Sequence, residues 1–389
     1  MTTTTTAPTG MLDAARALDP VIREFADETE QIRHVPPKLV DILHEHRMFD
    51  MILPAQYGGL ELDIITMARV LEDLAVADGS TAWAVGIGCG TSVISAYMPE
   101  ATTREIFQPR TVTGGAMAPN GRLTPINGGF RASGRWPFGS GCTHCQWLVG
   151  GSLIFEDGAP RMAPGGFVDW RTIVFPATDA EIIDTWHVSG LRGTGSRDIE
   201  VKDIFIPDER AIAIMSGART VDGPTYRFPV LGFLALTISP IPLGIARRAI
   251  DELIALAEAK TPMGAMNKLR DRAVVQYEIA QAEAKLRSAR AWMYEITEQI
   301  WDTVVAGDDV SMKDRALLRA ACAHAAIESA RVADTAYTLG GGTALYSTSV
   351  LQRCLRDCHA ATQHVMLSPT NYEVAGRLML GLPPPSPMV

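Results

Sequence analysis

The first hundred residues carry apolar side chains at three- and four-residue spacing. The segments KLVDILHEHRMF and ITMARVLEDLAVA both show this spacing, so each would bury one face of a helix. Short interruptions fall at Pro36–Pro37 and between Pro54 and Gly59. The pattern predicts a helical domain over residues 13–108, preceded by a threonine-rich tail at 1–12 that we expect to be disordered.

Between residues 109 and 218 the pattern changes to short runs rich in valine, isoleucine, phenylalanine and tryptophan. Glycine and proline interrupt these runs, which is typical of β-strands and their turns. In IEVKDIFIP, Ile199 and Val201 share one face, and the alternation then shifts to Ile204 and Ile206. This shift predicts a β-bulge within the strand.

Helical spacing returns over residues 225–380. In LGIARRAIDELIALAEAK, one apolar stripe is formed by Leu243, Ala246, Ile250, Leu253 and Ala257. Further helices at about 267–305 and 311–339 are long enough for a bundle. Gly340–Gly341–Gly342 separates them from a last helix near Ser349, and the proline-rich tail at 381–389 cannot continue a helix. The order of helices, strands and helices predicts an α+β protein with three domains.

Composition narrows the class of protein. With 389 residues, 47% of them hydrophobic, the chain can bury a large core. Its net charge of −9 and the absence of a Lys/Arg block disfavour nucleic acids and anionic membranes as partners. The N-terminus lacks the pattern of a signal peptide, and no stretch approaches the ~18 uncharged apolar residues of a membrane-spanning helix. The six cysteines lack the spacing of a disulfide framework, which favours the cytoplasm.

Several familiar motifs are missing or incomplete. The chain has neither GxGxxG after a strand nor GxxxxGK[ST], the two common nucleotide-binding loops. Cys142 and Cys145 have zinc-like spacing, but no second pair completes four ligands, so we expect no metal. The turn from Gly193 to Ser196 could hold a phosphate through its backbone amides, although such a turn alone is more often only a turn.

Three segments together resemble the acyl-CoA dehydrogenase superfamily: GRWPFGSGCTHCQW (134–147), WHVSGLRGTGSRDIEVKDIFIP (186–207) and RDCHAATQH (356–364). They look most like its flavin-dependent monooxygenase branch, the oxygenase components of two-component aromatic hydroxylases. The resemblance covers nearly the whole chain. It implies an N-terminal helical domain, a middle β-barrel or sandwich, and a C-terminal four-helix bundle, assembled as a homotetramer.

In that family the flavin ring lies between the β domain and the C-terminal bundle. Ser140, which precedes Gly141 in the FGSG turn, matches the residue that hydrogen-bonds the flavin near N5. An ordinary β-turn serine is the alternative. Met117, Ala118 and Pro119 match the segment that runs along the pyrimidine edge of the ring, where a backbone contact would tolerate many side chains.

Other cofactor candidates are weaker. Trp136 is either a ring-stacking residue or a core aromatic on one face of a strand. For the phosphate end, Arg192 offers a planar fork of donors and Ser196 lies in the glycine-rich turn. Arg270, in the bundle region, is a comparable candidate if the contact comes from a neighbouring subunit, as it does in this superfamily.

The two branches of the family need different chemistry near the Arg356–Asp357 pair. A dehydrogenase needs a glutamate to abstract a proton alpha to a thioester carbonyl, and the matching position is Val365, which cannot take a proton. His364 instead matches the histidine of the monooxygenase branch, whose imidazole could accept a phenol proton or a hydrogen bond. A helix-end histidine satisfied by a backbone carbonyl is the alternative. His359, about 140° away around an ideal helix, is a weaker pocket candidate and suits a structural role.

Substrate-side candidates follow Trp83. Many members of the monooxygenase branch carry a histidine in the helix after a Trp-Val-x-Gly stretch. Here Trp83–Ala–Val–Gly leads to Cys89, Thr91 and Ser92, and no histidine follows. A less basic pocket leaves a neutral substrate, an amine or a sulfur compound open beside a phenol.

The resemblance thus implies a reductase-dependent monooxygenase in which His364 and Ser140 act. A flavin reductase would supply reduced FMN, by contact or by diffusion alone, with FAD as the alternative. Molecular oxygen would form a flavin C4a-hydroperoxide, which transfers one oxygen atom to a small aromatic or heterocyclic substrate. An acyl-CoA-type dehydrogenase or oxidase is the second hypothesis, and a member of the fold without flavin is the third.

Overall fold

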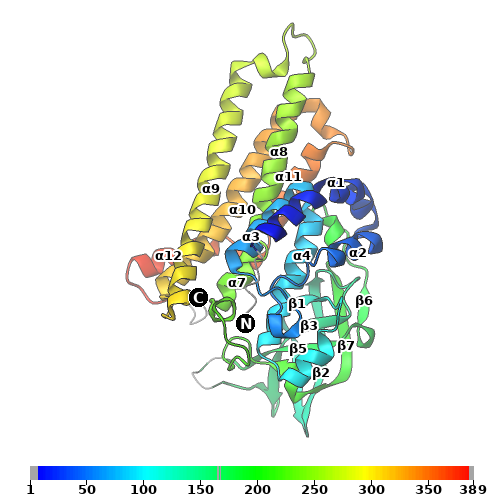
Figure 1. Cartoon of the computed structure of the whole chain (residues 1–389), viewed down its shortest axis with the longest axis vertical. Coiled ribbons are helices and arrows are strands. Elements are labelled where there is room, and N and C mark those ends of the chain that lie inside the picture. The colour runs from blue at the N-terminus through cyan, green and yellow to red at the C-terminus, as the bar shows by residue number, and fades with distance from the viewer. Residues whose placement is uncertain (1–7, 164–165, 167, 385–389) are drawn as a thin grey trace, which may run out of the picture.

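The computed structural model describes residues 8–163, 166 and 168–384, and it confirms the order of helices, strands and helices (Figure 1). Within these residues the N-terminal block consists of α1 (Pro8–Ile32), α2 (Pro37–Glu45), η1 (Ala55–Tyr57), α3 (Ile64–Ala77), α4 (Gly79–Ser92), η2 (Val93–Ala96) and α5 (Glu100–Ile106). Helix α1 begins at Pro8, so residues 8–12, which we expected in a disordered tail, belong to this helix. The remainder of that predicted tail lies outside the described residues.

Helix α4 runs through the interior of the protein and is buried along nearly its whole length. Asp78 caps its N-terminus by accepting a hydrogen bond from the backbone N–H of Thr81 at 2.7 Å. Two glycines allow close packing, because a Cβ at Gly86 would lie 2.2 Å from the carbonyl oxygen of Thr237, and Gly90 faces the same residue. The helix therefore has a fixed position beside the C-terminal block.

The middle block is one mixed sheet of β1 (Thr113–Ile126), β2 (Gly129–Gly139), β3 (Trp147–Glu156), β4 (Ala159–Pro160), β5 (Trp170–Pro176), β6 (Glu181–Ile183), β7 (Arg197–Pro207) and β8 (Ala211–Ile212). The strand order is β6-β7-β2-β1-β3-β5-β8, with β4 paired to β3. Only β1 and β3 pair in parallel among the pairs of named strands that the structure describes. The two ends of this order do not pair, so of the predicted barrel or sandwich only the sandwich-like arrangement fits.

The bulge predicted in β7 is confirmed. Ala132 of β2 faces Ile204, and Gly134 faces Val201, so β7 holds one residue more than β2 between these pairs. Asp203 lies in this interval with a φ of 53°. The bulge shifts the inward alternation of β7 from Ile199 and Val201 to Ile204 and Ile206 as expected.

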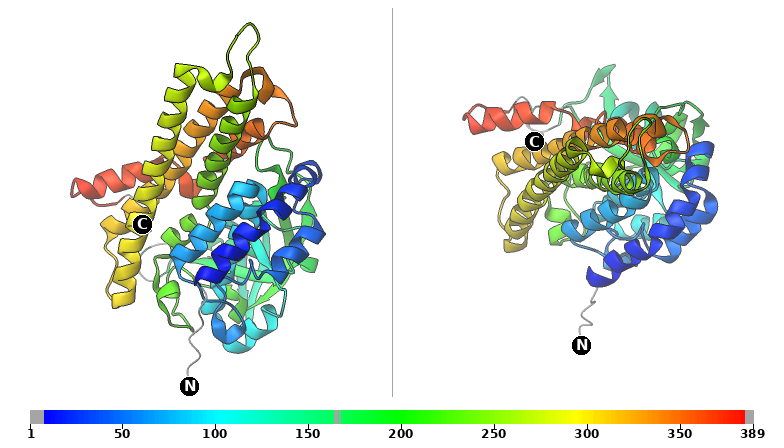
Figure 2. Two further views of the ribbon diagram at one scale, coloured as in Figure 1. Left: turned by 45° about the horizontal axis from the view of Figure 1, so that its top comes forward. Right: turned by 90° about the horizontal axis from the view of Figure 1, so that it is seen from above.

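The C-terminal block consists of α6 (Pro224–Arg227), α7 (Val230–Leu236), α8 (Pro240–Ala259), η6 (Leu269–Asp271), α9 (Ala273–Ala306), α10 (Met312–Gly340), η7 (Gly341–Leu345), α11 (Val350–Ala361), η8 (Val365–Leu367) and α12 (Thr370–Met379). Helices α8, α9, α10 and α11 form the predicted bundle, and α12 projects to one side of it (Figure 2). The five stripe residues of α8 are all buried.

One stretch is more apolar than we expected. The segment Val230–Ala259 is long and apolar enough to cross a membrane by composition alone. However, 83% of its apolar window is buried inside the protein, where α8 packs against α3 and α10. Its hydrophobicity therefore serves the core between the N-terminal and C-terminal blocks.

Candidate active site

Ser140 follows directly after β2, in a turn held from two sides. Its backbone forms a bridge with Gly115 of β1. The next residue, Gly141, has a φ of +75° and donates its N–H to the carbonyl oxygen of Thr194 at 3.1 Å. The Ser140 side chain is only 5% exposed. The end of β2, β1 and the η4 turn (Arg192–Thr194) thus fix one buried hydroxyl.

This hydroxyl belongs to a short relay that we call the hydroxyl chain: Ser140, Ser196 and Thr194. Oγ atoms of Ser140 and Ser196 lie 2.7 Å apart, and Ser196 Oγ lies 2.7 Å from Thr194 Oγ1. Thr194 Oγ1 donates to the carbonyl oxygen of Leu191 at 2.9 Å. Trp83 Nε1 of α4 donates to Ser140 Oγ at 3.3 Å. Ser196, which the sequence suggested for a separate phosphate end, therefore lies beside Ser140 instead.

His364 faces the same tryptophan. The rings of Trp83 and His364 meet edge to face, with their centroids 5.7 Å apart. His364 precedes η8, and its Nδ1 accepts the backbone N–H of Met366 at 3.2 Å. Val365, the position of the missing carboxylate, is 68% exposed. Trp83 thus connects Ser140 at the end of β2 with His364 at the end of α11.

The surroundings of His364 indicate which hydrogen-bonding role its ring can take. Burial lowers its pKa to about 4, because the charged imidazolium would lose its hydration. The ring is therefore neutral near pH 7, with one N–H. Since Nδ1 accepts from Met366, that hydrogen is on Nε2. Nε2 is therefore the hydrogen-bond donor of the ring in this arrangement.

Asp357 anchors the turn from the other side, a role that sequence reasoning missed. Its Oδ1 accepts the backbone N–H of Leu191 at 2.6 Å, and Leu191 itself has a φ of 50°. The carboxyl group is 2% exposed, and burial raises its pKa to about 7. The neighbouring Arg356 donates to the carbonyl oxygen of Ser189 and pairs with Glu30 at 2.8 Å. The Arg–Asp pair thus holds the loop that carries Thr194.

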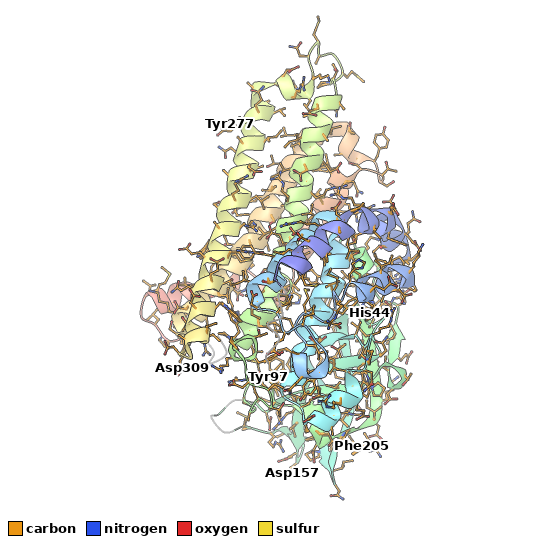
Figure 3. The ribbon with its side chains drawn as sticks, in the orientation of Figure 1. His44, Tyr97, Asp157, Phe205, Tyr277 and Asp309 are labelled. Atoms are coloured by element: carbon orange, nitrogen blue, oxygen red, sulfur yellow. The ribbon has the colours of Figure 1, made fainter. Side chains whose placement is uncertain are left out.

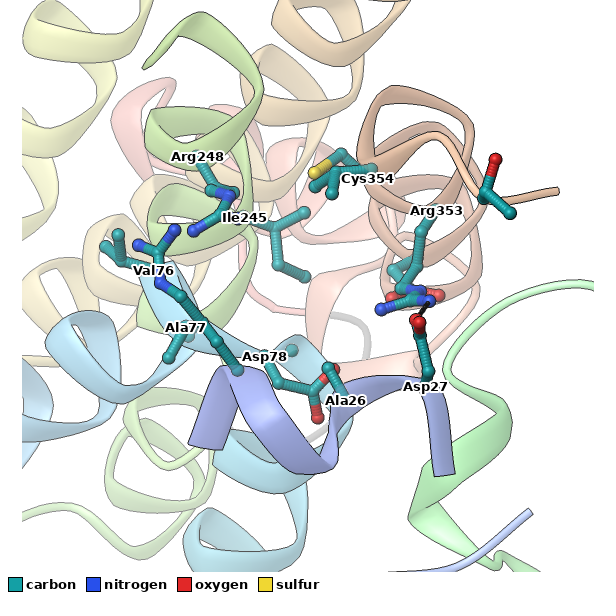
Figure 4. Close-up of a pocket in the computed structure, with 15 residues that line it drawn as sticks. Ala26, Asp27, Val76, Ala77, Asp78, Ile245, Arg248, Arg353 and Cys354 are labelled. Atoms are coloured by element: carbon teal, nitrogen blue, oxygen red, sulfur yellow. Dashed lines mark hydrogen bonds and ion pairs between the residues drawn. The ribbon is translucent and has the colours of Figure 1, made fainter. Parts of the chain in front are cut away.

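A polar cavity of about 190 Å³ lies close to this anchor, at the N-terminal end of α4 (Figure 4). Arg353 and Asp27 form an ion pair on one side, and Arg248 faces the opposite side. Asp78 and Asp357 also line it. Neither Ser140 nor His364 belongs to its lining, so this cavity is distinct from the wall formed by Ser140, Trp83 and His364.

The segment expected along the flavin edge forms an irregular part of β1. The pairing of β1 with β3 shifts register between Ala116 and Pro119. Met117 is half-buried there, whereas Ala118 and Pro119 are exposed. A Cβ at Gly151 of β3 would lie 1.9 Å from the carbonyl oxygen of Met117, so the two backbones touch. The bulge leaves this part of β1 open to a bound partner.

Trp136 is a core residue. It is fully buried, and its Nε1 donates to the carbonyl oxygen of Gly151 at 2.6 Å. A Cβ at Gly121, Gly134 or Gly150 would lie 2.4 to 2.9 Å from its ring. Because three strands enclose it, Trp136 has no face open to a cofactor, and its assignment to the flavin site is wrong.

The three pocket candidates after Trp83 on α4 are all buried. The Thr91 hydroxyl lies 2.7 Å from that of Thr113, at the start of β1 near Ser140. Cys89 Sγ instead donates to the carbonyl oxygen of Met48 at 3.3 Å, and Ser92 Oγ donates to that of Cys89 at 2.7 Å. The Thr91 hydroxyl also lies 2.9 Å from the carbonyl oxygen of Ile87, so each of the three side chains bonds a backbone oxygen. The structure therefore gives them packing roles rather than the predicted pocket role.

Three further candidates lie away from this wall. His359 is exposed on α11, and its Nε2 lies 2.8 Å from Asp334 Oδ1, which corrects its assignment to the pocket. Arg192 faces Glu30 of α1, with 3.9 Å between Nη1 and Oε1. Arg270 is on the exposed connection between α8 and α9, at the end of the bundle far from the strands (Figure 1).

The wall has the features that a flavin ring needs. Ser140 offers a buried oxygen at one point, with the rings of Trp83 and His364 on its side, and the β1 bulge carries the exposed residues Ala118 and Pro119. The chain also lacks a carboxylate at position 365. These residues fit a flavin enzyme without the base of a thioester dehydrogenase.

Comparison with known proteins gives the family of the chain. Residues 11–114 match the acyl-CoA dehydrogenase N-terminal domain, and residues 236–369 match the acyl-CoA dehydrogenase C-terminal domain. Indole-3-acetate monooxygenase of Pseudomonas putida is 34% identical over 97% of each chain. The structure of the HsaA monooxygenase from Mycobacterium tuberculosis has a TM-score of 0.91 at 28% identity, covering 98% of this chain and 100% of that one.

XiaF from Streptomyces, whose structure contains FADH2, shares the fold with a TM-score of 0.91 at 22% identity, covering 98% of each chain. Fold and site together define a flavin-dependent oxidoreductase. The chain belongs to the acyl-CoA dehydrogenase superfamily, in its flavin-dependent monooxygenase branch.

Proposed function

We propose that this protein is the oxygenase component of a two-component system that hydroxylates a small aromatic or heterocyclic substrate. The observation that carries the proposal is the wall of Ser140, Trp83 and His364, with an exposed valine where a dehydrogenase needs its carboxylate. A separate reductase supplies reduced FMN, with FAD as the alternative. The relative from Pseudomonas putida acts on an indole, which supports an aromatic substrate.

Bound reduced flavin supplies the electrons that activate dioxygen. The residues of this chain hold and orient the reactants. Ser140 would hold the flavin near N5, and the backbone of 117–119 would hold its pyrimidine edge. His364 donates a hydrogen bond from Nε2 to an oxygen of the substrate or of the oxidant, since its Nδ1 is engaged by Met366. Trp83 and Ser140 are buried, so this side of the site is closed to bulk water, which would limit the release of peroxide.

A coupled assay tests the proposal. We would supply reduced FMN through a flavin reductase and measure oxygen uptake and hydrogen peroxide with indole, a phenol or no substrate. The proposal predicts a hydroxylated product and less peroxide when a substrate is present. If the protein instead reduces bound flavin with an acyl-CoA thioester and needs no reductase, it is a dehydrogenase and the proposal fails.

We also propose that the chain assembles into a homotetramer in which Arg270 reaches the flavin phosphate of a neighbouring subunit. Four apolar side chains are exposed at the free end of the α8–α9 hairpin, and we call them the apolar tip: Met263, Met266, Val274 and Tyr277. Figure 3 shows Tyr277 near the end of α9 farthest from Asp157 of the sheet. An apolar group of this kind typically marks a protein contact.

A further inference from the structure

The hydroxyl chain has a definite direction that follows from counting protons. Thr194 Oγ1 lies 2.9 Å from the carbonyl oxygen of Leu191. A carbonyl carries no hydrogen, so the hydrogen between these two oxygens belongs to Thr194. Thr194 then has none to offer Ser196, whose Oγ lies 2.7 Å away. Ser196 must therefore donate to Thr194.

The same count continues to Ser140. Because the only hydroxyl hydrogen of Ser196 points to Thr194, Ser196 accepts the hydrogen of Ser140 across their 2.7 Å contact. Trp83 Nε1 is a donor only, and it donates to Ser140 Oγ from 3.3 Å. Ser140 Oγ is left without a hydrogen for any further partner. A hydroxyl oxygen has two acceptor positions, so one remains open beside that taken by Trp83.

The surroundings keep this direction fixed. Ser140, Ser196, Thr194 and Trp83 are all buried, so bulk water does not compete for their hydrogens. Leu191 cannot turn its carbonyl away, because Asp357 holds its N–H at 2.6 Å and Trp186 Nε1 donates to its oxygen at 3.2 Å. The end of the chain that accepts hydrogen is therefore anchored.

Resting on the flavin site proposed above, we propose that Thr194 and Ser196 are positioning residues that make the protein select reduced over oxidised flavin. N5 of reduced flavin carries a hydrogen and donates it, whereas N5 of oxidised flavin only accepts. Ser140 Oγ, held as an acceptor, forms a hydrogen bond with reduced N5. Oxidised N5 and Ser140 Oγ both present a lone pair, so no hydrogen bond forms between them. Neither Thr194 nor Ser196 needs to touch the flavin for this discrimination.

Equilibrium binding to both redox forms of FMN tests the inference. Fluorescence titration gives the Kd of oxidised FMN, and anaerobic ultrafiltration gives that of reduced FMN. We expect the unmodified protein to favour reduced FMN. Ser196→Ala removes the acceptor of the Ser140 hydrogen, and Thr194→Val removes the group that orients it, so Ser140 becomes free to donate. Each variant should lower the preference by about fivefold, the value of one hydrogen bond.

Two controls separate this effect from a general loss of packing. Thr172→Val changes an equally buried threonine of β5 whose hydroxyl has no hydrogen-bond partner in the described part of the chain, and it should keep the preference. Thr194→Ser keeps the hydroxyl, so this variant should keep the preference for reduced FMN. Circular dichroism checks that each variant is folded, and either folded variant, Ser196→Ala or Thr194→Val, decides the question.

An unchanged preference in a folded Ser196→Ala or Thr194→Val variant would overturn the inference while leaving the flavin site intact. The proposed function would be refuted by a different result, in which the unmodified protein bound neither FMN nor FAD in either redox state. The two failures are thus distinguishable in the same set of titrations.

Discussion

His364 is neutral near pH 7, because burial lowers its pKa to about 4. Its Nδ1 is engaged by Met366, so Nε2 carries the hydrogen that the ring can donate. We predict that His364→Ala lowers coupled hydroxylation at least about tenfold, the scale of losing a buried charge-free donor and its packing. The Kd of reduced FMN should change little. Comparing product with oxygen consumed measures the effect.

His364→Gln is the matched control, since its amide can place a donor near the position of Nε2. It should recover part of the coupling. The rate profile of the unmodified enzyme should show no inflection from this histidine between pH 6 and 8, because the ring stays neutral above about pH 4. An inflection near the ordinary histidine pKa of about 6.5 that disappears in His364→Gln would contradict the donor role.

The packing of helices and strands determines contacts that cannot be predicted from single residues. The spacing of apolar residues predicted the helical blocks and the β7 bulge, because burial of one face is a local property of the chain. The contact between Asp357 and Leu191 joins residues 166 positions apart, and no local pattern records it. Trp136 is enclosed by glycines from three strands, and its role depended on their pairing. His359 is exposed and bonds Asp334 of α10, a partner that depends on how α11 packs against α10.

Asp357 of α11, which anchors the loop at Leu191, gives a prediction for stability. Its pKa is about 7 in the folded protein and 3.8 in an unfolded chain, so the folded state binds more protons between these values. The free energy of unfolding contributed by this group therefore falls as pH rises from about 4 to 7. Asp357→Asn retains an acceptor for Leu191 but cannot ionise. The variant should gain up to about 4 kcal/mol on the unmodified protein across this range, measured by urea unfolding.

A difference between these two proteins that stays constant with pH would show that Asp357 does not titrate in this window.

Stability of the sheet gives a separate prediction. Gly150→Ala places a Cβ 2.6 Å from the Trp136 ring and should cost about 1 to 3 kcal/mol by overpacking. Gly342→Ala, at a position with open space, should be close to neutral in the same urea experiment. Equal effects would argue against the tight cage around Trp136.

At the scale of the whole molecule, the proposed assembly links the apolar tip to flavin binding. The paired change Met266→Glu and Tyr277→Glu places charges on that surface and should shift the protein from tetramers to smaller species in light scattering. Affinity for reduced FMN should fall with it, as it should in Arg270→Ala. Met379→Glu, on the exposed end of α12, tests whether any added surface charge has this effect. A tetramer that survives the paired change would exclude the tip as the contact.

The resemblance located Ser140 and His364 from short motifs, and the structure joined them through Trp83. The central claim is that this wall supports transfer of oxygen from dioxygen to an aromatic ring. Its most direct test supplies reduced FMN, an aromatic substrate such as indole, and ¹⁸O-labelled dioxygen, followed by mass spectrometry of the product. We predict one labelled oxygen atom in the product. A product whose added oxygen comes from water would contradict the account. So would a protein that oxidises acyl-CoA thioesters and forms no oxygenated product from the aromatic substrates.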